Sequence, residues 1–373
     1  MKPTDPALPP KRILSIDTLR GFDMLMISGA GSFIYLLHGK TSWLWLDALA
    51  LQFEHPAWNG FTFYDFIFPL FLFLAGMSLP FSLDKSLDQG WSKSRIYRKA
   101  FRRMLILIAL GILDKNAPTP YFDWSQISFV GVLQRIGFAG FMVTILYVNF
   151  NSRARAIWFV SLLLFYYALM FLVPVPGYGS GDLSIEGNLH GWIDRHFLPG
   201  RLLQTTYDEN GLLTQIPALS LTLLGTLAAD ILRNEAISAQ VKLRNLIITG
   251  ALCVGAGLLW SLHFPINKHL WSSSFIMLTG GMGLLSFALL YWVIDILNYR
   301  KWTFFFVVIG MNSLTIYLAW RFIDFGHTSR LLFEGLYSAA PKEWHPVFES
   351  LGALIIVWVF LYVLYRKRIF IKI

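Results

Sequence analysis

The chain has 373 residues, of which 55% are hydrophobic and only 14% are charged, with a formal net charge of +9. A soluble domain is about 45–50% apolar and about 25% charged, so this composition excludes a soluble single domain and a disordered chain. The one cysteine, Cys253, lies in an apolar stretch, which excludes a disulfide-stapled secreted module. The class that remains is a polytopic membrane protein, an all-α bundle of transmembrane helices.

A helix needs about 20 mostly apolar residues to cross the hydrocarbon core of a bilayer. Windows of that length predict about ten spans (10–11), at 13–38, 63–83, 100–114, 127–148, 155–174, 212–232, 243–263, 271–297, 302–320 and 347–365. We expect a cytoplasmic lead over 1–12, a single transmembrane domain over 13–366 and a basic cytoplasmic tail over 367–373.

Lysine and arginine accumulate on the cytoplasmic side of membrane proteins. With the N-terminus inside, most of them fall in short inner loops and in the tail, above all between Lys85 and Arg103. Both termini are therefore expected in the cytoplasm, and the positive charge follows from topology. It does not indicate nucleic-acid binding, because the interleaved aromatic platform of such surfaces is absent. No Asn-x-Ser/Thr sequon occurs, which favours a bacterial inner membrane.

Ionisable residues inside a span are costly and indicate function by default. In the first span, Asp17 and Arg20 are three residues apart and can pair on one helix face, and Asp23 extends that face. They hold an anionic ligand from the cytosolic side, or they form a packing salt bridge. In the fourth span, Gln134 precedes Arg135, which must meet an acid such as Asp17 or Asp23, a carbonyl, or the phosphate of an anionic cofactor.

The first outer loop leads into the second span with His55, Trp58, Asn59 and Asp65 close together. A neutral imidazole at a membrane boundary suits a general base or an acyl-accepting nucleophile. The alternative is an interfacial histidine followed by an aspartate that caps the helix.

Two later segments add polar residues. Lys268, between the seventh and eighth spans, is a snorkelling anchor or a substrate contact, and Asn312 in the ninth is helix–helix glue or a site residue. No histidine spacing typical of a metal site occurs. These residues indicate a transporter or a membrane-embedded group-transfer enzyme, and both remain open at this point.

The sequence resembles the heparan-α-glucosaminide N-acetyltransferase-like family of membrane acyltransferases. The resemblance is carried by an ordered series of motifs over almost the whole chain. They are Arg12-x-x-Ser15-x-Asp17-x-x-Arg20-Gly21-Phe22, His55-x-x-Trp58-Asn59-Gly60, Asp65-x-x-Phe68-Pro69, Gly131-Val-Leu-Gln134-Arg135-Ile-Gly137, Asn188-Leu with Ile193-Asp194-Arg195, Asp208-Glu-Asn-Gly211-Leu-Leu, Pro265-Ile-Asn267-Lys268-x-Leu-Trp271 and Gly310-Met-Asn312-Ser313.

The resemblance implies transfer of an acetyl group from cytosolic acetyl-CoA to an amino sugar such as glucosamine on the non-cytoplasmic side, with no metal. The family's active-site histidine falls on His55, as general base or transient acyl carrier, with Asn59 and Asp65 orienting the imidazole and the acceptor. The expected acceptor-binding residues are Trp58, Asn267, Lys268, Trp271 and Asn312. We also predict that Asp17, Arg20, Gln134 and Arg135 contact CoA, because arginine side chains inside a span can pair with its phosphates. A homodimer is a further expectation from the family.

The chain departs from the family pattern in three places. The lumenal domain that precedes the first helix of the animal enzyme is expected to be absent, 28–32 stands where an asparagine is expected, and 208–211 reads Asp-Glu-Asn-Gly in place of Asp-Pro-Glu-Gly. One alternative is a membrane O-acyltransferase, whose first-helix histidine is replaced here by Gly31. The other is an amino-sugar or sugar transporter that uses Asp17, Arg20 and Arg135 as a gating network.

Overall fold

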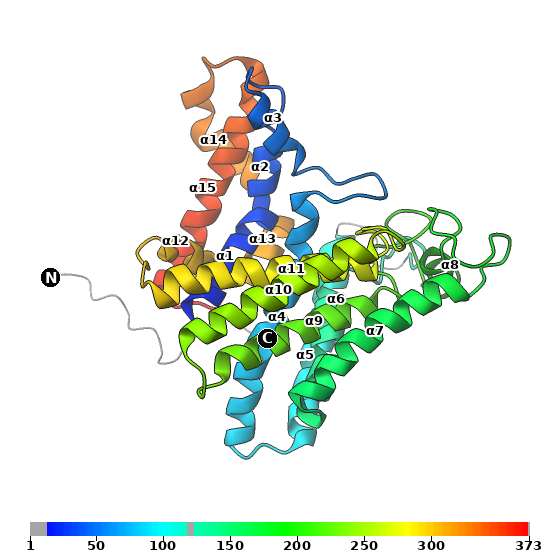
Figure 1. The fold of residues 1–373 in the computed structure, drawn as a ribbon. Helices are drawn as coiled ribbons and strands as arrows, with labels where there is room; N and C mark the ends of the chain where they lie inside the picture. The colour runs from blue at the N-terminus through cyan, green and yellow to red at the C-terminus, as the bar shows by residue number, and fades with distance from the viewer. Residues whose placement is uncertain (1–12, 118–122, 372–373) are drawn as a thin grey trace.

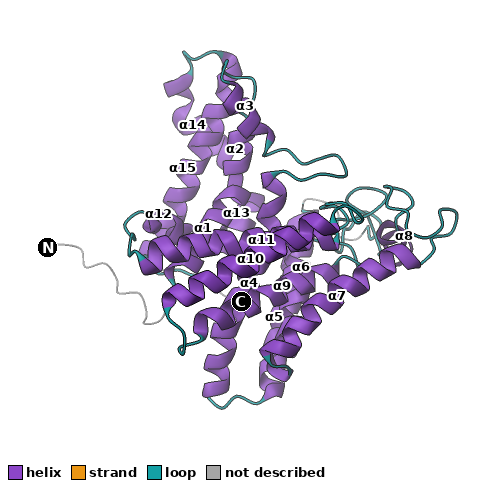
Figure 2. Ribbon diagram, viewed as in Figure 1, coloured by secondary structure: helices purple, strands orange, loops and turns teal. Residues whose placement is uncertain are grey.

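The computed structural model describes residues 13–117 and 123–371, and all the regular secondary structure in those two ranges is helical (Figure 2). The predicted all-α transmembrane fold is confirmed. The whole predicted lead over 1–12, with Arg12 of the first motif, and the last two residues of the predicted tail lie outside the described residues. The prediction of one domain over 13–366 stays a prediction.

The first half of the chain supplies the helices that frame the N-terminal motifs (Figure 1). They are α1 (Leu14–Leu25), the π-helical turn η1 (Met26–Ala30), α2 (Gly31–Tyr35), α3 (Leu44–Leu51), α4 (Phe63–Asp88), α5 (Lys93–Asn116), α6 (Val132–Asn149), α7 (Ser152–Leu172) and α8 (Leu189–Phe197). The first span breaks at Ser28 and Gly29, where Gly29 has a φ of 117°, a conformation that glycine adopts without a steric cost.

The second half continues the bundle and ends in a helical hairpin. Its elements are α9 (Gln215–Arg233), α10 (Ala239–Trp260), α11 (Ser273–Leu290), η2 (Tyr291–Ile296), α12 (Thr303–Gly310), α13 (Ser313–Phe322), α14 (Phe325–Tyr337), η3 (Lys342–Trp344) and α15 (His345–Arg366). α12 and α13 are bent by 68° at a short break that contains Asn312.

Seven helices in the described part of the chain are long and apolar enough to cross a membrane, or eight if the bent pair counts as one span. The protein is therefore a multi-pass membrane protein. Of the ten predicted segments, 13–38 is divided among α1, η1 and α2, and 100–114 lies within α5, whose first turns are rich in basic residues. The number of ten spans stays a prediction.

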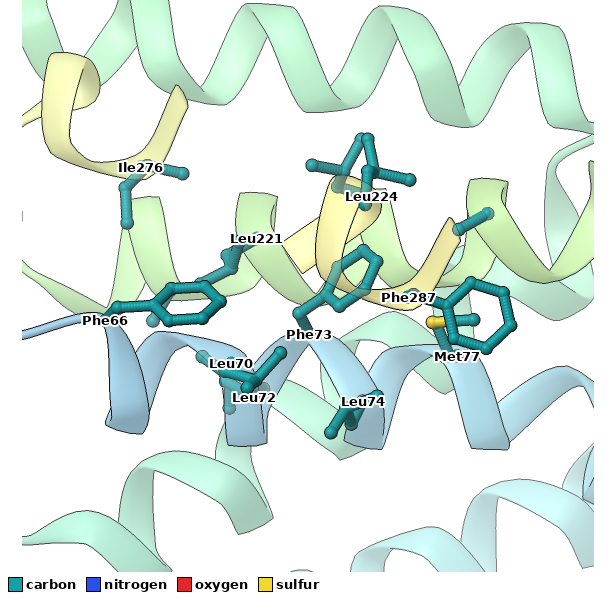
Figure 3. Close-up of a cluster of buried hydrophobic side chains, with 14 of the residues drawn as sticks. Phe66, Leu70, Leu72, Phe73, Leu74, Met77, Leu221, Leu224, Ile276 and Phe287 are labelled. Atoms are coloured by element: carbon teal, nitrogen blue, oxygen red, sulfur yellow. The ribbon is translucent and has the colours of Figure 1, made fainter. Parts of the chain in front are cut away.

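The core lies where α4, α9 and α11 pack together (Figure 3). α4 contributes Phe66, Leu70 and Phe73, whose side chains are at most 2% exposed. Small residues let α4 and α9 approach closely, because a Cβ added at Gly76 would lie 2.1 Å from the Thr222 carbonyl oxygen. This core fixes the start of α4 relative to the loops before α9 and α11.

The connecting loops gather at two ends of the bundle (Figure 1). At one end, Lys93 at the start of α5 donates to Asn149 at 3.0 Å, and Ser152 at the start of α7 donates to Asp230 of α9 at 2.6 Å. At the other end, the Gly60 N–H donates to the Ile266 carbonyl at 3.0 Å. The first end collects the loops that the charge pattern assigns to the cytoplasm, and the assignment to a side of the membrane stays a prediction.

Candidate active site

The start of α4 fixes a carboxylate beside an imidazole. Asp65 lies in the first turn of α4 and is 1% exposed, and its Oδ2 accepts the Thr62 N–H at 2.9 Å, as in a helix capping box. Its Oδ1 lies 2.6 Å from Nδ1 of His55. The carboxylate therefore favours the tautomer with the proton on Nδ1, which leaves the lone pair of Nε2 free to act as a base.

His55 is held at the surface of this end of the bundle. It precedes Pro56 in the loop between α3 and α4, and its side chain is 38% exposed. The ring of Tyr64 stacks on the imidazole, with the ring centroids 5.0 Å apart. A reactive Nε2 at the surface and a buried carboxylate behind it are the arrangement of an oriented base.

Lys268 reaches the imidazole from the loop between α10 and α11. Its Nζ lies 3.0 Å from His55 Nε2, 3.9 Å from Asp65 Oδ1 and 3.7 Å from an oxygen of Glu209. The same loop is joined to the His55 loop by Asn267, whose amide donates to Asn59 Oδ1 at 3.0 Å. The structure thus brings His55, Asn59, Asp65, Asn267 and Lys268 into one cluster.

A second imidazole–carboxylate pair adjoins the first. His269 Nδ1 lies 3.1 Å from Glu209 Oε1 and 2.9 Å from the Tyr207 hydroxyl. Its ring stacks on Trp58 with the centroids 5.4 Å apart, and the Trp58 indole N–H donates to the Leu183 carbonyl at 2.9 Å. Trp58 therefore lies in the cluster as one wall of the second pair.

The loop that carries Glu209 is fixed by two buried side chains. Asp194 of α8 accepts the Asp208 N–H and the Leu212 N–H, each at 3.0 Å. Arg135 of α6 donates to the Glu209 carbonyl at 2.7 Å and to the Thr214 hydroxyl. These contacts hold the loop before α9 against the two helices.

The environment shifts the pKa values of the ionisable groups in and around this loop in different directions. Burial alone would raise the pKa of Glu209, but the hydrogen bond with His269 and the charge of Lys268 outweigh it and lower the pKa to about 2. Burial raises the pKa of Asp194 to about 7, although the two backbone N–H groups oppose the shift. Burial and the charge of Arg135 lower the pKa of His190 to about 3. Glu209 is thus the permanently charged acid that faces Lys268.

The comparison with known families fits this geometry. Residues 12–265, more than half of the chain, match the family model described as "Heparan-alpha-glucosaminide N-acetyltransferase, catalytic". The chain belongs to this family. It is 29% identical to the heparan-alpha-glucosaminide N-acetyltransferase of Homo sapiens, with 98% of this chain and 60% of that protein covered. The identity to the mouse protein of the same name is 26%, with 97% and 60% covered. The chain thus spans about 60% of the length of these relatives.

In this family member, the residues predicted to bind CoA fall into two places. Arg20 pairs with Asp17 at 3.2 Å and donates to Ser78 of α4. Ser78 follows Asp65 by almost four turns of α4, which is about 20 Å along the helix. Arg135 lies instead beneath the outer loop, fully buried, and Gln134 donates to the Phe129 carbonyl at 3.4 Å. Arg135 thus meets carbonyl and hydroxyl oxygens, which was one of its predicted alternatives.

Two of the predicted acceptor-binding residues lie apart from the open face of the cluster. Trp271 is 0% exposed, and the Arg135 guanidinium lies 4.1 Å above its ring. Asn312 is 1% exposed at the break between α12 and α13, and its amide nitrogen has no hydrogen-bond partner among the described residues. The structure therefore places these two side chains in buried surroundings.

Sequence reasoning missed the second pair. Glu209 lies in the motif Asp208-Glu-Asn-Gly211, and His269 is next to Lys268. Neither residue has a role predicted from the sequence. The available signal was that both motifs carry charged residues in outer loops. The sequence does not show that the loop before α9 and the loop before α11 are in contact, because α9 and α10 lie between Glu209 and His269 in the chain.

Proposed function

We propose that this protein transfers the acetyl group of cytosolic acetyl-CoA to the amine of an amino sugar on the non-cytoplasmic side of a bacterial inner membrane. The observation that carries the proposal is the oriented His55–Asp65 pair, 2.6 Å apart, at the start of α4, the end of that helix away from the basic first turns of α5. Membership of the family supports the acyl-transfer chemistry. The printed names of the relatives support an amino sugar as acceptor.

The chemistry at His55 follows from its tautomer. Nδ1–H is donated to Asp65, so Nε2 takes the proton of the acceptor amine as its nitrogen attacks the acetyl carbonyl carbon. The new N–C bond forms as the C–S bond breaks, and the leaving sulfur of CoA receives a proton from the imidazolium. Asp65 stabilises the positive charge on the ring during this step. In the second mechanism, the same Nε2 carries the acetyl group before the amine accepts it.

The other predicted site residues have supporting roles in this proposal. Asn59 and Asn267 keep the two outer loops in register around His55, and Trp58 forms a wall for the sugar ring. Arg20, at the opposite depth of α4, contacts a phosphate or the pantetheine of CoA, and the basic first turns of α5 attract this anion. The acetyl-CoA chain thus enters from the inner end, and the amino sugar enters from the outer end.

The experiment is CoA release by purified protein in detergent, with acetyl-CoA in the presence and absence of glucosamine. His55→Ala is expected to abolish the acceptor-dependent release. His327→Ala, which removes an exposed histidine from α14, is the matched control and is expected to keep it. Equal release by His55→Ala and the wild type would place the chemistry elsewhere and contradict the proposal.

A transporter is the second candidate, and the broken helices favour it. The break at Ser28 and Gly29 lies beside α13, which follows the break at Asn312. Discontinuous helices of this kind line the substrate path of many transporters. Glucosamine uptake into liposomes that contain the protein but no acetyl-CoA, with no CoA release under any condition, would favour this function over the enzyme.

A further inference from the structure

The ammonium group of Lys268 occupies the position that the reaction needs. Its Nζ lies 3.0 Å from His55 Nε2, the atom that has to accept a proton from the acceptor, and 3.4 Å from His55 Nδ1. These nearly equal distances place Nζ to the side of Nε2 and not along its lone pair. An ammonium group this close repels a second ammonium group that approaches Nε2 and occupies the space beside it. Lys268 must therefore move away from Nε2 before the chemical step.

The surroundings of Nζ are those of a cation site. Besides His55 Nε2, they comprise Asp65 Oδ1 at 3.9 Å and Glu209 Oε2 at 3.7 Å. The Lys268 side chain is 11% exposed and Asp65 is 1% exposed, so water screens this group of charges weakly. The three groups come from the loop before α4, the first turn of α4 and the loop before α9, and they converge on one nitrogen.

The charges at this position fit a second ammonium group. Glu209 stays ionised, because its pKa is lowered to about 2. Its other oxygen faces His269 at 3.1 Å, and His269 Nε2 faces the Pro56 carbonyl at 3.3 Å. This second pair holds Glu209 in place without using the oxygen that faces Lys268. When Lys268 withdraws, the oxygen of Glu209 still faces His55 Nε2 and attracts a cation.

We propose that Lys268 holds, in the free protein, the site that takes the ammonium of the acceptor, and that Glu209 selects an amine over a neutral hydroxyl at that site. This inference rests on the proposed function and names the group of the acceptor that the site recognises. A ligand ammonium replaces Nζ and pairs with Glu209. It loses one proton to water before the chemical step, and the neutral amine then gives its next proton to His55 Nε2 as its nitrogen attacks. A hydroxyl acceptor brings no charge to displace Lys268.

The competing explanation is that Lys268 binds the acceptor directly or only anchors its loop. The two explanations predict opposite effects of removing the lysine charge. If Lys268 occupies the ammonium site, Lys268→Met, which keeps the stem of the side chain, removes a competitor and a like charge. If Lys268 contacts the sugar, the same substitution weakens binding.

The test is calorimetric binding of glucosamine, and of glucose as its neutral counterpart, to purified protein without acetyl-CoA at a pH where glucosamine is cationic. We expect the Kd for glucosamine to fall about tenfold in Lys268→Met and to rise about tenfold in Glu209→Gln, magnitudes that correspond to one charge pair. The Kd for glucose is expected to stay within about twofold in both. Lys342→Met, which changes an exposed lysine in the segment before α15, is the control.

Further variants separate charge from folding. Lys268→Gln keeps a donor without a charge and is expected to behave as Lys268→Met does, and Glu209→Asp keeps the charge and is expected to restore part of the affinity. Four results would each overturn the inference. They are weaker glucosamine binding after loss of the lysine charge, an unchanged Kd for glucosamine in Glu209→Gln, an equal change in the Kd for glucose, and no glucosamine binding to any variant.

The binding assay is independent of catalysis, so the two proposals fail in different ways. If the Kd values follow the expected pattern but the turnover assay shows no release of CoA, the proposed function is wrong and the protein is left with an amine-binding site. If CoA release depends on His55 but neither Lys268→Met nor Glu209→Gln changes the Kd for glucosamine, only the inference about Lys268 and Glu209 is wrong.

Discussion

Asp65 fixes both the first turn of a helix and the tautomer of the candidate base. One oxygen accepts the N–H of Thr62 and the other faces His55 Nδ1. The carboxylate is thus oriented by the helix before any substrate arrives, which is the purpose of a buried partner behind a catalytic histidine. The residue next to it in space, Lys268, contacts the same imidazole, with its Nζ 3.0 Å from His55 Nε2.

The role of Asp65 is tested by Asp65→Asn. The amide keeps the size of the side chain but no longer stabilises a proton on His55 Nδ1, so we expect kcat for CoA release to fall about 10²–10⁴-fold, the range of general acid–base contributions. Asp88→Asn, at the exposed opposite end of α4, should leave kcat unchanged. A loss below about threefold in Asp65→Asn would contradict the role.

Glu209 makes the stability of the protein depend on acid pH. Its pKa is about 2 in the folded state and about 4.5 in the unfolded chain, so its contribution is complete above pH 4.5 and is lost as the pH falls towards 2. The full contribution is about 3 kcal/mol, from about 1.4 kcal/mol for each pKa unit. We expect Glu209→Gln to melt below the wild type at neutral pH.

The melting temperatures of the wild type and Glu209→Gln should converge as the pH falls from 4.5 towards 2, because protonation of Glu209 then favours the unfolded chain until the folded protein is protonated as well. Thermal unfolding in detergent at several pH values measures this. Glu186→Gln, which removes an exposed glutamate from the outer loop before α8, is the control. A difference in melting temperature that stays the same from pH 7 to pH 3 would show that Glu209 is not the group responsible.

At the scale of elements, the site depends on loops that are held in place by buried side chains of neighbouring helices. α6 supplies Arg135, which is fully buried and holds the loop before α9 through the Glu209 carbonyl and the Thr214 hydroxyl. α8 supplies Asp194, which holds the same loop from the other side. The position of Glu209 is therefore set by α6, which is distant in sequence, and by α8, the helix just before its loop.

Arg135→Met tests this support. The substitution removes the two hydrogen bonds that the charged guanidinium donates and leaves the Glu209 carbonyl with only the Thr214 hydroxyl at 3.3 Å. We therefore expect the free energy of unfolding to fall by about 2–3 kcal/mol, as for hydrogen bonds to a charged group. Arg330→Met removes an exposed arginine paired with Glu349 and should change it by less than about 1 kcal/mol. Equal melting temperatures for the two variants would contradict the structural role of Arg135.

Hydropathy predicted most of the helices because a span must satisfy its backbone internally with apolar side chains outside. It could not predict the break at Ser28 and Gly29 or the bend near Asn312, because these depend on packing against neighbouring helices. In the site, His55 and Asp65 were predictable because they are close in sequence. Glu209 and His269 were not, because their pairing exists only once α9, α10 and α11 are packed.

At the scale of the whole molecule, two ends of the bundle carry different chemistry. Basic residues crowd the first turns of α5, which follows the end of α4, and the histidine–carboxylate cluster lies at the start of α4. Figure 1 shows these two ends of α4 far apart. The charge pattern predicts that the first end faces the cytoplasm. In the proposed function, an acetyl group passes from a donor at one end to an acceptor at the other.

Single-cysteine labelling tests the orientation. Cys253 is buried and is replaced by Ala, and cysteines are then introduced at Gln89 and Ser180, which are exposed at opposite ends of the bundle. In intact cells with a permeable outer membrane, we expect a membrane-impermeant thiol reagent to label Ser180→Cys and to leave Gln89→Cys unlabelled until the inner membrane is opened. Labelling of Gln89→Cys but not of Ser180→Cys in intact cells would show the opposite orientation in the membrane.

The central claim is acetyl transfer across the membrane through His55. The direct measurement uses proteoliposomes with glucosamine inside and acetyl-CoA outside, in which the protein is inserted with its basic end outwards. We expect N-acetylglucosamine to accumulate in the lumen while CoA appears outside, and both signals to vanish in His55→Ala and persist in His327→Ala. Product formed only on the acetyl-CoA side, or product formed equally by His55→Ala, would contradict the account.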